Sequence, residues 1–187
     1  QYSKRSSDRQ IAGYPLQSTA VGAPMSAASI FSPNNGASAV NWRRRGWEVP
    51  RTTNTDLTNW RFTAALEGSF EIGDRYFNWD VGGMFNENDT AIVNNGNFYI
   101  PAVRAAVGPS FRNAAGEAVC GTVAAPIAGC VPWNPYAGFG TGAVANSLDD
   151  EAVRNYLFRE EHATGNTQTH NYFANISGTV VPLPAGD

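Results

Sequence analysis

The stretch WRFTAALEGSF, Trp60–Phe70, alternates strictly between two kinds of side chain. Its even-numbered positions hold Trp, Phe, Ala, Leu, Gly and Phe, and its odd-numbered positions hold Arg, Thr, Ala, Glu and Ser. Because successive strand residues point to opposite faces, this pattern predicts a ribbon with one apolar and one polar face. Such a ribbon fits a soluble sheet whose apolar face covers a core. It also fits an outer-membrane barrel whose apolar face meets lipid.

A second alternating run, Tyr76–Phe85, follows the turn formers Gly73 and Asp74. Two such runs joined by a tight turn predict a β-hairpin over residues 60–85. Each run has about ten residues, the length with which a tilted strand crosses a bilayer, and its aromatic residues stand near its ends, as in the girdles of membrane barrels. A third alternating run within residues 167–187 predicts another strand and a short turn.

The overall composition favours strands and long loops. Of the 187 residues only 16% are charged and 12% are aromatic, while glycine and proline number 19 and 11. This composition argues against a helical bundle and against a charged disordered tail. The net charge is −3, and we interpret the one basic run, Arg43–Arg45, as a solvated loop. Nucleic acid is therefore not an expected partner.

Two long segments in which apolar residues follow no regular repeat are predicted to be outer loops. They are residues 1–59, with short strand pieces near the start and near Trp47, and residues 86–166. The second contains Cys120 and Cys130, with neither His nor further Cys at metal-ligand spacing. We therefore expect these cysteines to form a disulfide, which points to an oxidising compartment.

The second loop is predicted to contain one helix. Ser147 and Asp150 have the spacing of a capping box, so the helix is expected to begin at Ser147. Val153, Tyr156 and Leu157 then share a face, and Gly165 is expected to end the helix soon after.

Four stretches, taken in order, resemble the barrel portion of TonB-dependent outer-membrane receptors of Gram-negative bacteria such as xanthomonads. They are RFTAALEGSFEIGDRYFNWDVGGMFNEND, GCVPWNP, LDDEAVRNYLFREEHATG and ANISGTVVPLPAG, and the likeness extends from Trp42 to Asp187. The resemblance implies an all-β fold, namely a segment of a transmembrane antiparallel β-barrel with long extracellular loops and one short loop helix. Complete barrels of this kind have about 22 strands around a plug.

The resemblance also implies a function, a location and partners. Such receptors sit in the outer membrane and bind and import a scarce nutrient: siderophore-bound iron, cobalamin, an oligosaccharide or a peptide. We expect this chain to be a fragment that supplies barrel wall and substrate-facing loops, because it holds neither a plug nor a segment that contacts TonB. Its expected partners are the remainder of the receptor, outer-membrane lipid and the nutrient, with TonB reached only through the absent plug.

One cluster of side chains is a candidate for ligand binding. It consists of the loop aromatics Phe98, Tyr99, Trp133, Tyr136 and Phe139. Exposed aromatic rings stack on sugars or siderophore rings, but packing of the loops on one another explains the same residues equally well.

Catalysis, metal binding and cofactors are not expected. Glu160, Glu161 and His162 are adjacent, and adjacent helix residues point in different directions, so we interpret them as a solvated helix end. Neither His162 nor His170 has further ligands at metal-binding spacing. The glycine-rich GFGTG at residues 138–142 lacks the lysine and flanking elements of a phosphate loop. We therefore expect a protein that is not an enzyme.

A second class of function stays open at this point. The same alternating strands would suit a secreted soluble β-structural or adhesion protein. Such a protein would self-assemble into a homo-oligomer through its unpaired strand edges.

Overall fold

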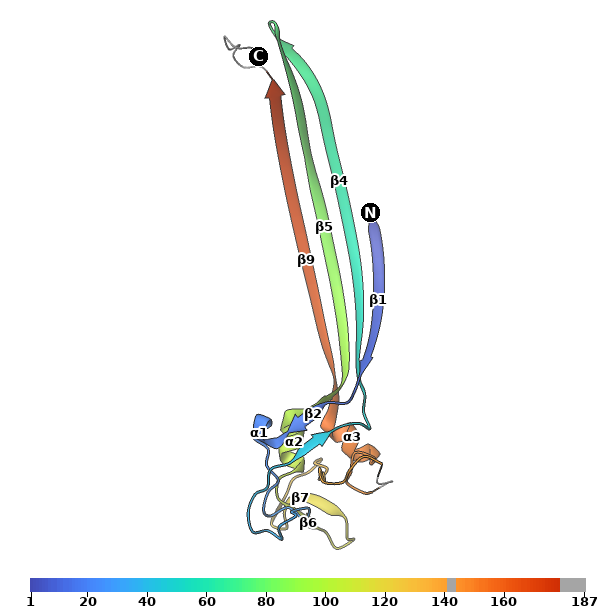
Figure 1. Ribbon diagram of the computed structural model, residues 1–187, viewed down its shortest axis with the longest axis vertical. Helices are drawn as coiled ribbons and strands as arrows, with labels where there is room; N and C mark the ends of the chain where they lie inside the picture. The colour runs from blue at the N-terminus through green and yellow to red at the C-terminus, as the bar shows by residue number, and fades with distance from the viewer. Residues whose placement is uncertain (141–143, 179–187) are drawn as a thin grey trace. The chain divides into compact units, whose positions relative to one another are not determined.

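The computed structural model describes residues 1–140 and 144–178, which are mostly β-structure with antiparallel sheets (Figure 1). This agrees with the all-β class expected from the sequence. The chain divides into two compact units. The sheet unit comprises Gln1–Ser7, Thr55–Ile92 and the described part of Ala163–Asp187. The core unit comprises Asp8–Asn54 and the described part of Val93–His162.

Four strands form the long sheet, in the order β1, β4, β5, β9 (Figure 1). Their bounds are Tyr2–Ile11, Arg51–Ile72, Arg75–Phe98 and Phe158–Gly178, respectively. The turn between β4 and β5 contains Gly73, whose φ of 61° lies in the left-handed region that favours glycine. Within the described residues β1 and β9 are the two edges, so the sheet does not close on itself there.

The predicted hairpin is present, but its strands extend well beyond residues 60–85. β4 has 22 residues and β5 has 24. Both continue into sequence that was expected to be loop, where polar side chains replace the apolar alternation. Side-chain hydrogen bonds link the strands there: Thr53 donates to Asn94 over 2.9 Å, and Asn59 donates to Asn86 over 3.0 Å.

Strand β1 is present where a short strand piece was expected near the start of residues 1–59, but its ten residues make it longer than predicted. Its sequence, YSKRSSDRQI, has no apolar alternation from which this length could be predicted. Backbone pairing holds it in place: Gln1 and Arg61 exchange two hydrogen bonds, of 2.8 and 2.7 Å. Strand β9 likewise begins at Phe158, well before residue 167, and the predicted turn beyond residue 178 lies outside the described residues.

Short elements make up the rest of the core unit. The helices are α1 (Ser18–Val21), α2 (Ile100–Ala106) and α3 (Glu151–Leu157). β2 (Pro15–Gln17) pairs antiparallel with β3 (Arg43–Arg45). β6 (Ser110–Arg112), β7 (Ala118–Thr122) and β8 (Ala125–Pro126) form a three-stranded antiparallel sheet. None of the described helices is long and apolar enough to cross a membrane.

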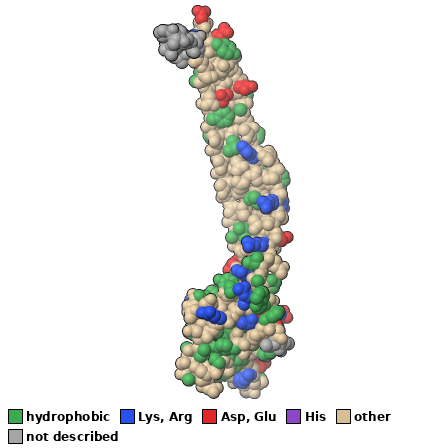
Figure 2. Space-filling model, viewed as in Figure 1, with side chains coloured by type: hydrophobic (Ala, Val, Ile, Leu, Met, Phe, Trp, Pro, Cys, Tyr) green, Lys and Arg blue, Asp and Glu red, His purple; other side chains and the backbone are tan. Residues whose placement is uncertain are grey.

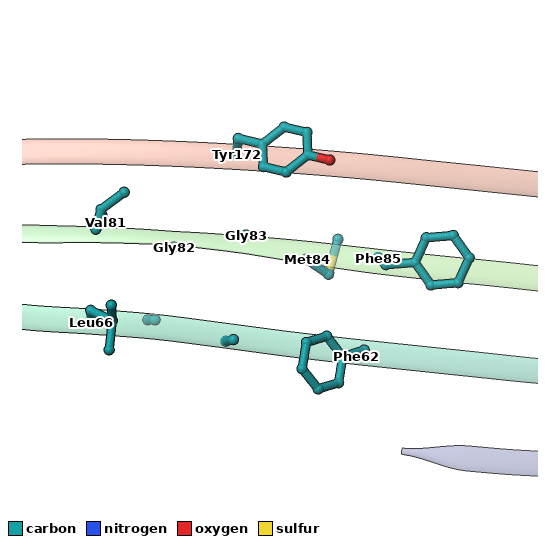
Figure 3. A pocket seen from close by; sticks show the side chains of 10 residues that line it. Phe62, Leu66, Val81, Gly82, Gly83, Met84, Phe85 and Tyr172 are labelled. Atoms are coloured by element: carbon teal, nitrogen blue, oxygen red, sulfur yellow. The ribbon is translucent and has the colours of Figure 1, made fainter.

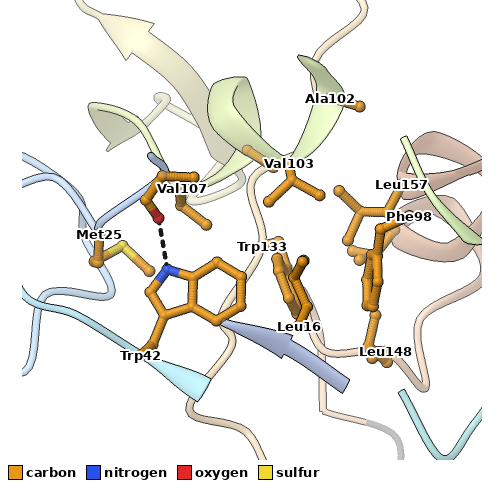
Figure 4. Packing of buried hydrophobic residues seen from close by; sticks show 13 residues of the cluster. Leu16, Met25, Trp42, Phe98, Ala102, Val103, Val107, Trp133, Leu148 and Leu157 are labelled. Atoms are coloured by element: carbon orange, nitrogen blue, oxygen red, sulfur yellow. Dashed lines mark hydrogen bonds between the residues drawn. The ribbon is translucent and has the colours of Figure 1, made fainter. Parts of the chain in front are cut away.

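The hydrophobic core is built around two tryptophans (Figure 4). The rings of Trp42 and Trp133 meet edge to face at 5.0 Å, and Trp133 also contacts Phe98 at 5.6 Å. Trp42 donates its indole N–H to the Ala23 carbonyl over 2.9 Å. The other buried members come from β2, α2, α3 and the segments that adjoin them: Leu16, Ala23, Met25, Ala102, Val103, Ala106, Val107, Leu148, Val153 and Leu157.

Helix α3 is shorter than predicted at both ends. Its N-cap is Asp150, whose carboxylate accepts a hydrogen bond from the Ala152 backbone N–H over 3.0 Å, so the helix begins after Ser147. It ends at Leu157 because Phe158 already belongs to β9, and Gly165 lies inside that strand. Strand pairing therefore overrides the local signal for a longer helix.

The basic run Arg43–Arg45 is strand β3 and not the solvated loop that its charge suggested. Alternation along the strand turns the middle residue, Arg44, inward, where it is buried. Its guanidinium forms an ion pair with the equally buried Glu48 carboxylate. Compensation of charge by this partner makes the burial tolerable.

The expected disulfide is present between Cys120 and Cys130. It closes the loop that holds the β7–β8 turn, and the Ile127 N–H donates to the Cys120 carbonyl over 2.9 Å inside it. Cys120 is fully buried, whereas most of the enclosed residues are exposed. The bond thus fixes a surface loop to the core unit.

Candidate functional site

The predicted apolar face of the sheet unit is present on three neighbouring strands. Phe70 of β4 stacks on Phe77 of β5 with ring centroids 5.4 Å apart, and Phe85 of β5 contacts His170 of β9 at 5.1 Å. Even positions of β4 therefore share a face with odd positions of β5, as the alternation predicted. Figure 2 shows hydrophobic side chains at the surface of the sheet, with acidic side chains gathered toward the β4–β5 turn.

A shallow hollow of about 650 Å³ lies on this apolar face (Figure 3). Its walls are aliphatic and aromatic: Phe62, Leu66, Val81, Phe85 and Tyr172. Gly82 and Gly83 also line it, and with no side chains of their own they leave room between the rings. Phe62, Leu66 and Tyr172 are 68%, 69% and 81% exposed, so this face is open in the chain as described.

The opposite face of the same strands is polar. It carries a second hollow, of about 530 Å³, lined by Glu67, Ser69, Asn78, Asp80 and Ser177 among others. Asn175 of β9 donates to the Asp80 carboxylate of β5 over 2.8 Å. One surface of the sheet therefore suits hydrocarbon, and the other suits water.

Phe173 of β9 is an exception to the separation of apolar and polar side chains between the two faces of the sheet. A Cβ atom built on Gly82 would lie 2.6 Å from the Phe173 ring and 2.7 Å from the Ala64 carbonyl oxygen. The Phe173 ring therefore covers Gly82, and only glycine fits beneath it. This contact was missed because the second face of this run was interpreted as polar from Asn171, Asn175 and Ser177, without Phe173.

The apolar face is confined to the half of each strand nearer the β4–β5 turn. Farther along, amide and carboxylate groups bridge β5 and β9. Asn166 and Gln168 both donate to Glu87, each over 2.9 Å, and Asn166 also donates to Asp89 over 2.6 Å. This half of the sheet unit is polar on its surface, so it does not extend the apolar band.

A different kind of site lies in the core unit, beside Tyr99 and Arg159. The Arg159 guanidinium stacks on the Tyr99 ring, 4.6 Å from its centroid. Tyr99 precedes α2, where its backbone N–H donates to the Leu157 carbonyl over 2.7 Å and so ties α2 to the end of α3. Burial raises the pKa of nearby Tyr156, an effect that Arg159 opposes and Tyr99 reinforces.

Two hollows adjoin at Arg159 and Glu160. The first, of about 390 Å³, is lined by Asn95, Arg154, Asn155 and Phe158 among others. The second, of about 450 Å³, is lined by Asn97, Phe98, Tyr99, Ile100, Pro101 and Glu161. Arg159 and Glu160 line both, so they form the wall between the two hollows.

The five predicted ligand-binding aromatics fall into two groups. Trp133 is enclosed in the core, where packing explains it. Phe98 contacts Trp133 and is only 6% exposed, but it also lines the second hollow beside Tyr99. Tyr99, Tyr136 and Phe139 are 41%, 40% and 62% exposed. Of these three, Tyr99 lies beside groups that can bind a polar ligand.

The acidic run beside His162 also has a different structure from the one expected. Glu160, Glu161 and His162 belong to strand β9 and not to a helix end. His162 Nε2 lies 2.5 Å from Glu160 Oε1, and Glu161 accepts a hydrogen bond from Asn97 over 3.0 Å. In residues 1–140 and 144–178 no three His, Cys, Asp or Glu side chains group closely enough to hold a metal ion.

The polar residues of the two hollows were not predicted from the sequence. Arg154 and Arg159 belong to α3 and β9, and Asn95 and Asn97 belong to β5. They are distant in sequence and follow no motif, so only the pairing of β5 with β9 brings them together.

Comparisons with known proteins give no further assignment: no protein-family model, curated protein or solved structure matches the chain.

Proposed function

We propose that this chain is part of a TonB-dependent outer-membrane receptor, supplying strands of the barrel wall and substrate-facing outer loops. The observation that carries the proposal is the pair of contrasting faces on β4, β5 and β9. Phe62, Leu66 and Tyr172 stand exposed on one face, and Glu67 and Asp80 line a polar hollow on the other. In a membrane barrel the first face meets lipid and the second meets the watery interior.

Strand length supports the same proposal. A tilted strand needs about 9 to 11 residues to cross a bilayer, whereas β4, β5 and β9 have 22, 24 and 21. The apolar band accounts for about one bilayer crossing near the β4–β5 turn. The remaining polar half of each strand would stand outside the membrane and lead into the core unit, which would form the substrate-facing loops.

The proposed role is to bind and import a scarce nutrient, with the rest of the receptor, outer-membrane lipid and the nutrient as partners. The edges β1 and β9 would pair with further strands of the same barrel, because unpaired edges are unstable in lipid. TonB would act through a plug elsewhere in the receptor. No catalysis is required for this role.

The test is insertion into lipid. The chain is mixed with phospholipid vesicles whose acyl chains carry bromine, which quenches tryptophan fluorescence on contact. Trp60 belongs to the apolar run and is 54% exposed, whereas Trp133 belongs to the buried core. With the other tryptophans replaced by Phe, we expect a variant that retains only Trp60 to be quenched strongly and one that retains only Trp133 to be unaffected. Equal, weak quenching of both, with the chain in the aqueous phase after detergent extraction, would refute the proposal.

A second candidate is favoured by one observation. Both edges of the described sheet are open, so identical chains could pair edge to edge in a secreted, soluble β-structural or adhesion protein. Sedimentation without detergent separates the two. Ordered oligomers that form in water and ignore vesicles would favour this alternative over the receptor.

A further inference from the structure

We infer that the two hollows beside Arg159 bind a neutral oligosaccharide. The first step is their size and arrangement. At about 390 and 450 Å³, each lies at the small end of the range for ligand pockets and suits a single sugar unit. They share the wall formed by Arg159 and Glu160, so a ligand that fills both has at least two linked units.

The second step is the chemistry of the lining. Guanidinium and amide groups donate hydrogen bonds in planar pairs, and carboxylates accept them. Arg154, Arg159 and Asn155 supply the donors of the first hollow, and Glu160 supplies an acceptor. Sugar hydroxyls both donate and accept, so they match such a mixed lining.

The third step is the aromatic ring. Tyr99 lines the second hollow and is 41% exposed, and the stacked Arg159 guanidinium holds its ring in place. A fixed ring that is partly open to solvent offers an apolar surface for the carbon face of a sugar. Phe158 contributes a ring to the first hollow.

The fourth step is charge. Over the two hollows together Arg154 and Arg159 stand against Glu160 and Glu161, so two positive groups meet two negative ones. Glu48 also lines the first hollow, but its charge is already compensated by Arg44. A balanced lining gives little attraction for a strongly charged ligand, which favours a neutral saccharide over an anionic iron complex.

A peptide is the competing occupant of the same space. Peptides in extended form bind by adding a strand to a free sheet edge, and β9, which carries Arg159 and Glu160, is an edge of the described sheet. The lining of the hollows consists of side chains that suit sugar hydroxyls and the carbon face of a sugar, and displacement by a peptide is an outcome of the test. The role of the saccharide as the imported nutrient rests on the proposed function, whereas binding itself does not.

The experiment uses the full chain in detergent, labelled with a fluorophore, on an array of neutral oligosaccharides of two to six units. We expect binding to at least one series. Arg159→Ala and Tyr99→Ala should each weaken it at least tenfold, because one removes the shared wall and the other removes the ring. Tyr99→Phe should stay within threefold. The matched control is Tyr136→Ala, which removes an equally exposed tyrosine (40%) that does not line either hollow.

Arg159→Lys guards against loss of folding, because it keeps the charge and removes only the planar pair of donors. It should lose most of the binding while near-ultraviolet circular dichroism stays unchanged. Absence of binding to every neutral sugar would overturn the inference, as would binding that survives both alanine variants. Displacement of the sugar by ferric siderophore, cyanocobalamin or tripeptide at equal affinity would do the same. Sugar binding by a chain that ignores lipid vesicles would refute the receptor and leave this inference standing.

Discussion

The sheet unit and the core unit use apolar side chains in opposite ways. In the described residues every buried apolar side chain belongs to the core unit, with Trp133, Met25 and Leu148 fully enclosed. The sheet unit instead leaves Phe62, Leu66 and its other large apolar residues at least partly open to the surroundings. The same residue types therefore stabilise the core unit by packing inside it. In the sheet unit they need lipid or another protein surface to cover them.

This difference shows what each unit needs in order to be stable. Apolar burial contributes roughly 25 cal/mol per Å² removed from water, so the core unit gains this stabilisation by folding on itself. The sheet unit gains it only when lipid or another protein surface covers its apolar face. Exposed apolar patches of this kind mark an interaction surface.

The largest expected effect is in the core unit. Trp133→Ala should lower its free energy of unfolding by about 3 to 5 kcal/mol, because it leaves a cavity where the rings of Trp42 and Phe98 pack. Denaturant titration followed by tryptophan fluorescence measures the change. Trp60→Ala, at a position that is 54% exposed, should change the same value by less than about 0.5 kcal/mol.

A companion variant sharpens this prediction. Among the described residues the Trp133 indole N–H has no hydrogen-bond partner. Trp133→Phe removes this unsatisfied donor and keeps a ring, so its cost should be well below that of Trp133→Ala. If Trp60→Ala were as damaging as Trp133→Ala, the contrast between the two units would be wrong.

The next largest effect tests the apolar face of the sheet unit. Leu66→Arg should weaken insertion into phospholipid vesicles by about 2 to 4 kcal/mol, the cost of a basic residue near the middle of a bilayer. Vesicle flotation measures the bound fraction. Glu67→Arg introduces the same side chain one residue later, on the polar face, and should leave the bound fraction nearly unchanged. Equal losses in the two variants would mean that Leu66 does not face lipid.

Removal of the disulfide should have a smaller effect, limited to the core unit. Changing Cys120 and Cys130 together to Ser should lower stability by about 2 to 3 kcal/mol, since the bond closes a short loop. Thermal unfolding with and without reductant measures this change, and mass analysis reports the bond itself. Vesicle binding by the sheet unit should not change. Two free thiols in protein taken from an oxidising compartment would contradict the structure.

The smallest effect concerns the helix cap. Asp150→Ala should cost about 1 kcal/mol, because the Ala152 N–H loses its acceptor at the start of α3. Asp150→Asn retains a side-chain oxygen and should cost much less. Denaturation midpoints of the two variants measure the difference. An equal cost would mean that charge, and not the hydrogen bond, stabilises this helix end.

Prediction from sequence succeeded where one short segment carries the whole signal. Alternation in Trp60–Phe70 predicted both the strand and its two faces, and Gly73 and Asp74 predicted the turn. The cysteine pair predicted its own disulfide. Failures came where partners distant in sequence decide the structure. The short strand piece expected near Gln1 did not predict the full length of β1, which has no alternating pattern, and Arg44 is buried only because Glu48 compensates its charge.

The candidate sites divide in the same way. Local sequence identified Tyr99 as an aromatic residue of interest, but it could not separate Tyr99 from Phe98, which adjoins it in the chain and is buried in the core. Arg159 was not identified at all, because its relation to Tyr99 depends on the pairing of β9 with β5.

By itself, the sequence determined the alternating hairpin, its apolar and polar faces and the disulfide, because strand geometry and short loops act over a few neighbouring residues. Tertiary structure alone decided the length of β4, β5 and β9, since backbone pairing with a neighbour extends a strand through polar sequence without an apolar pattern. It also decided which aromatic residues are buried and which line the hollows beside Arg159. Burial and side-chain proximity depend on segments that the chain brings together only when it folds.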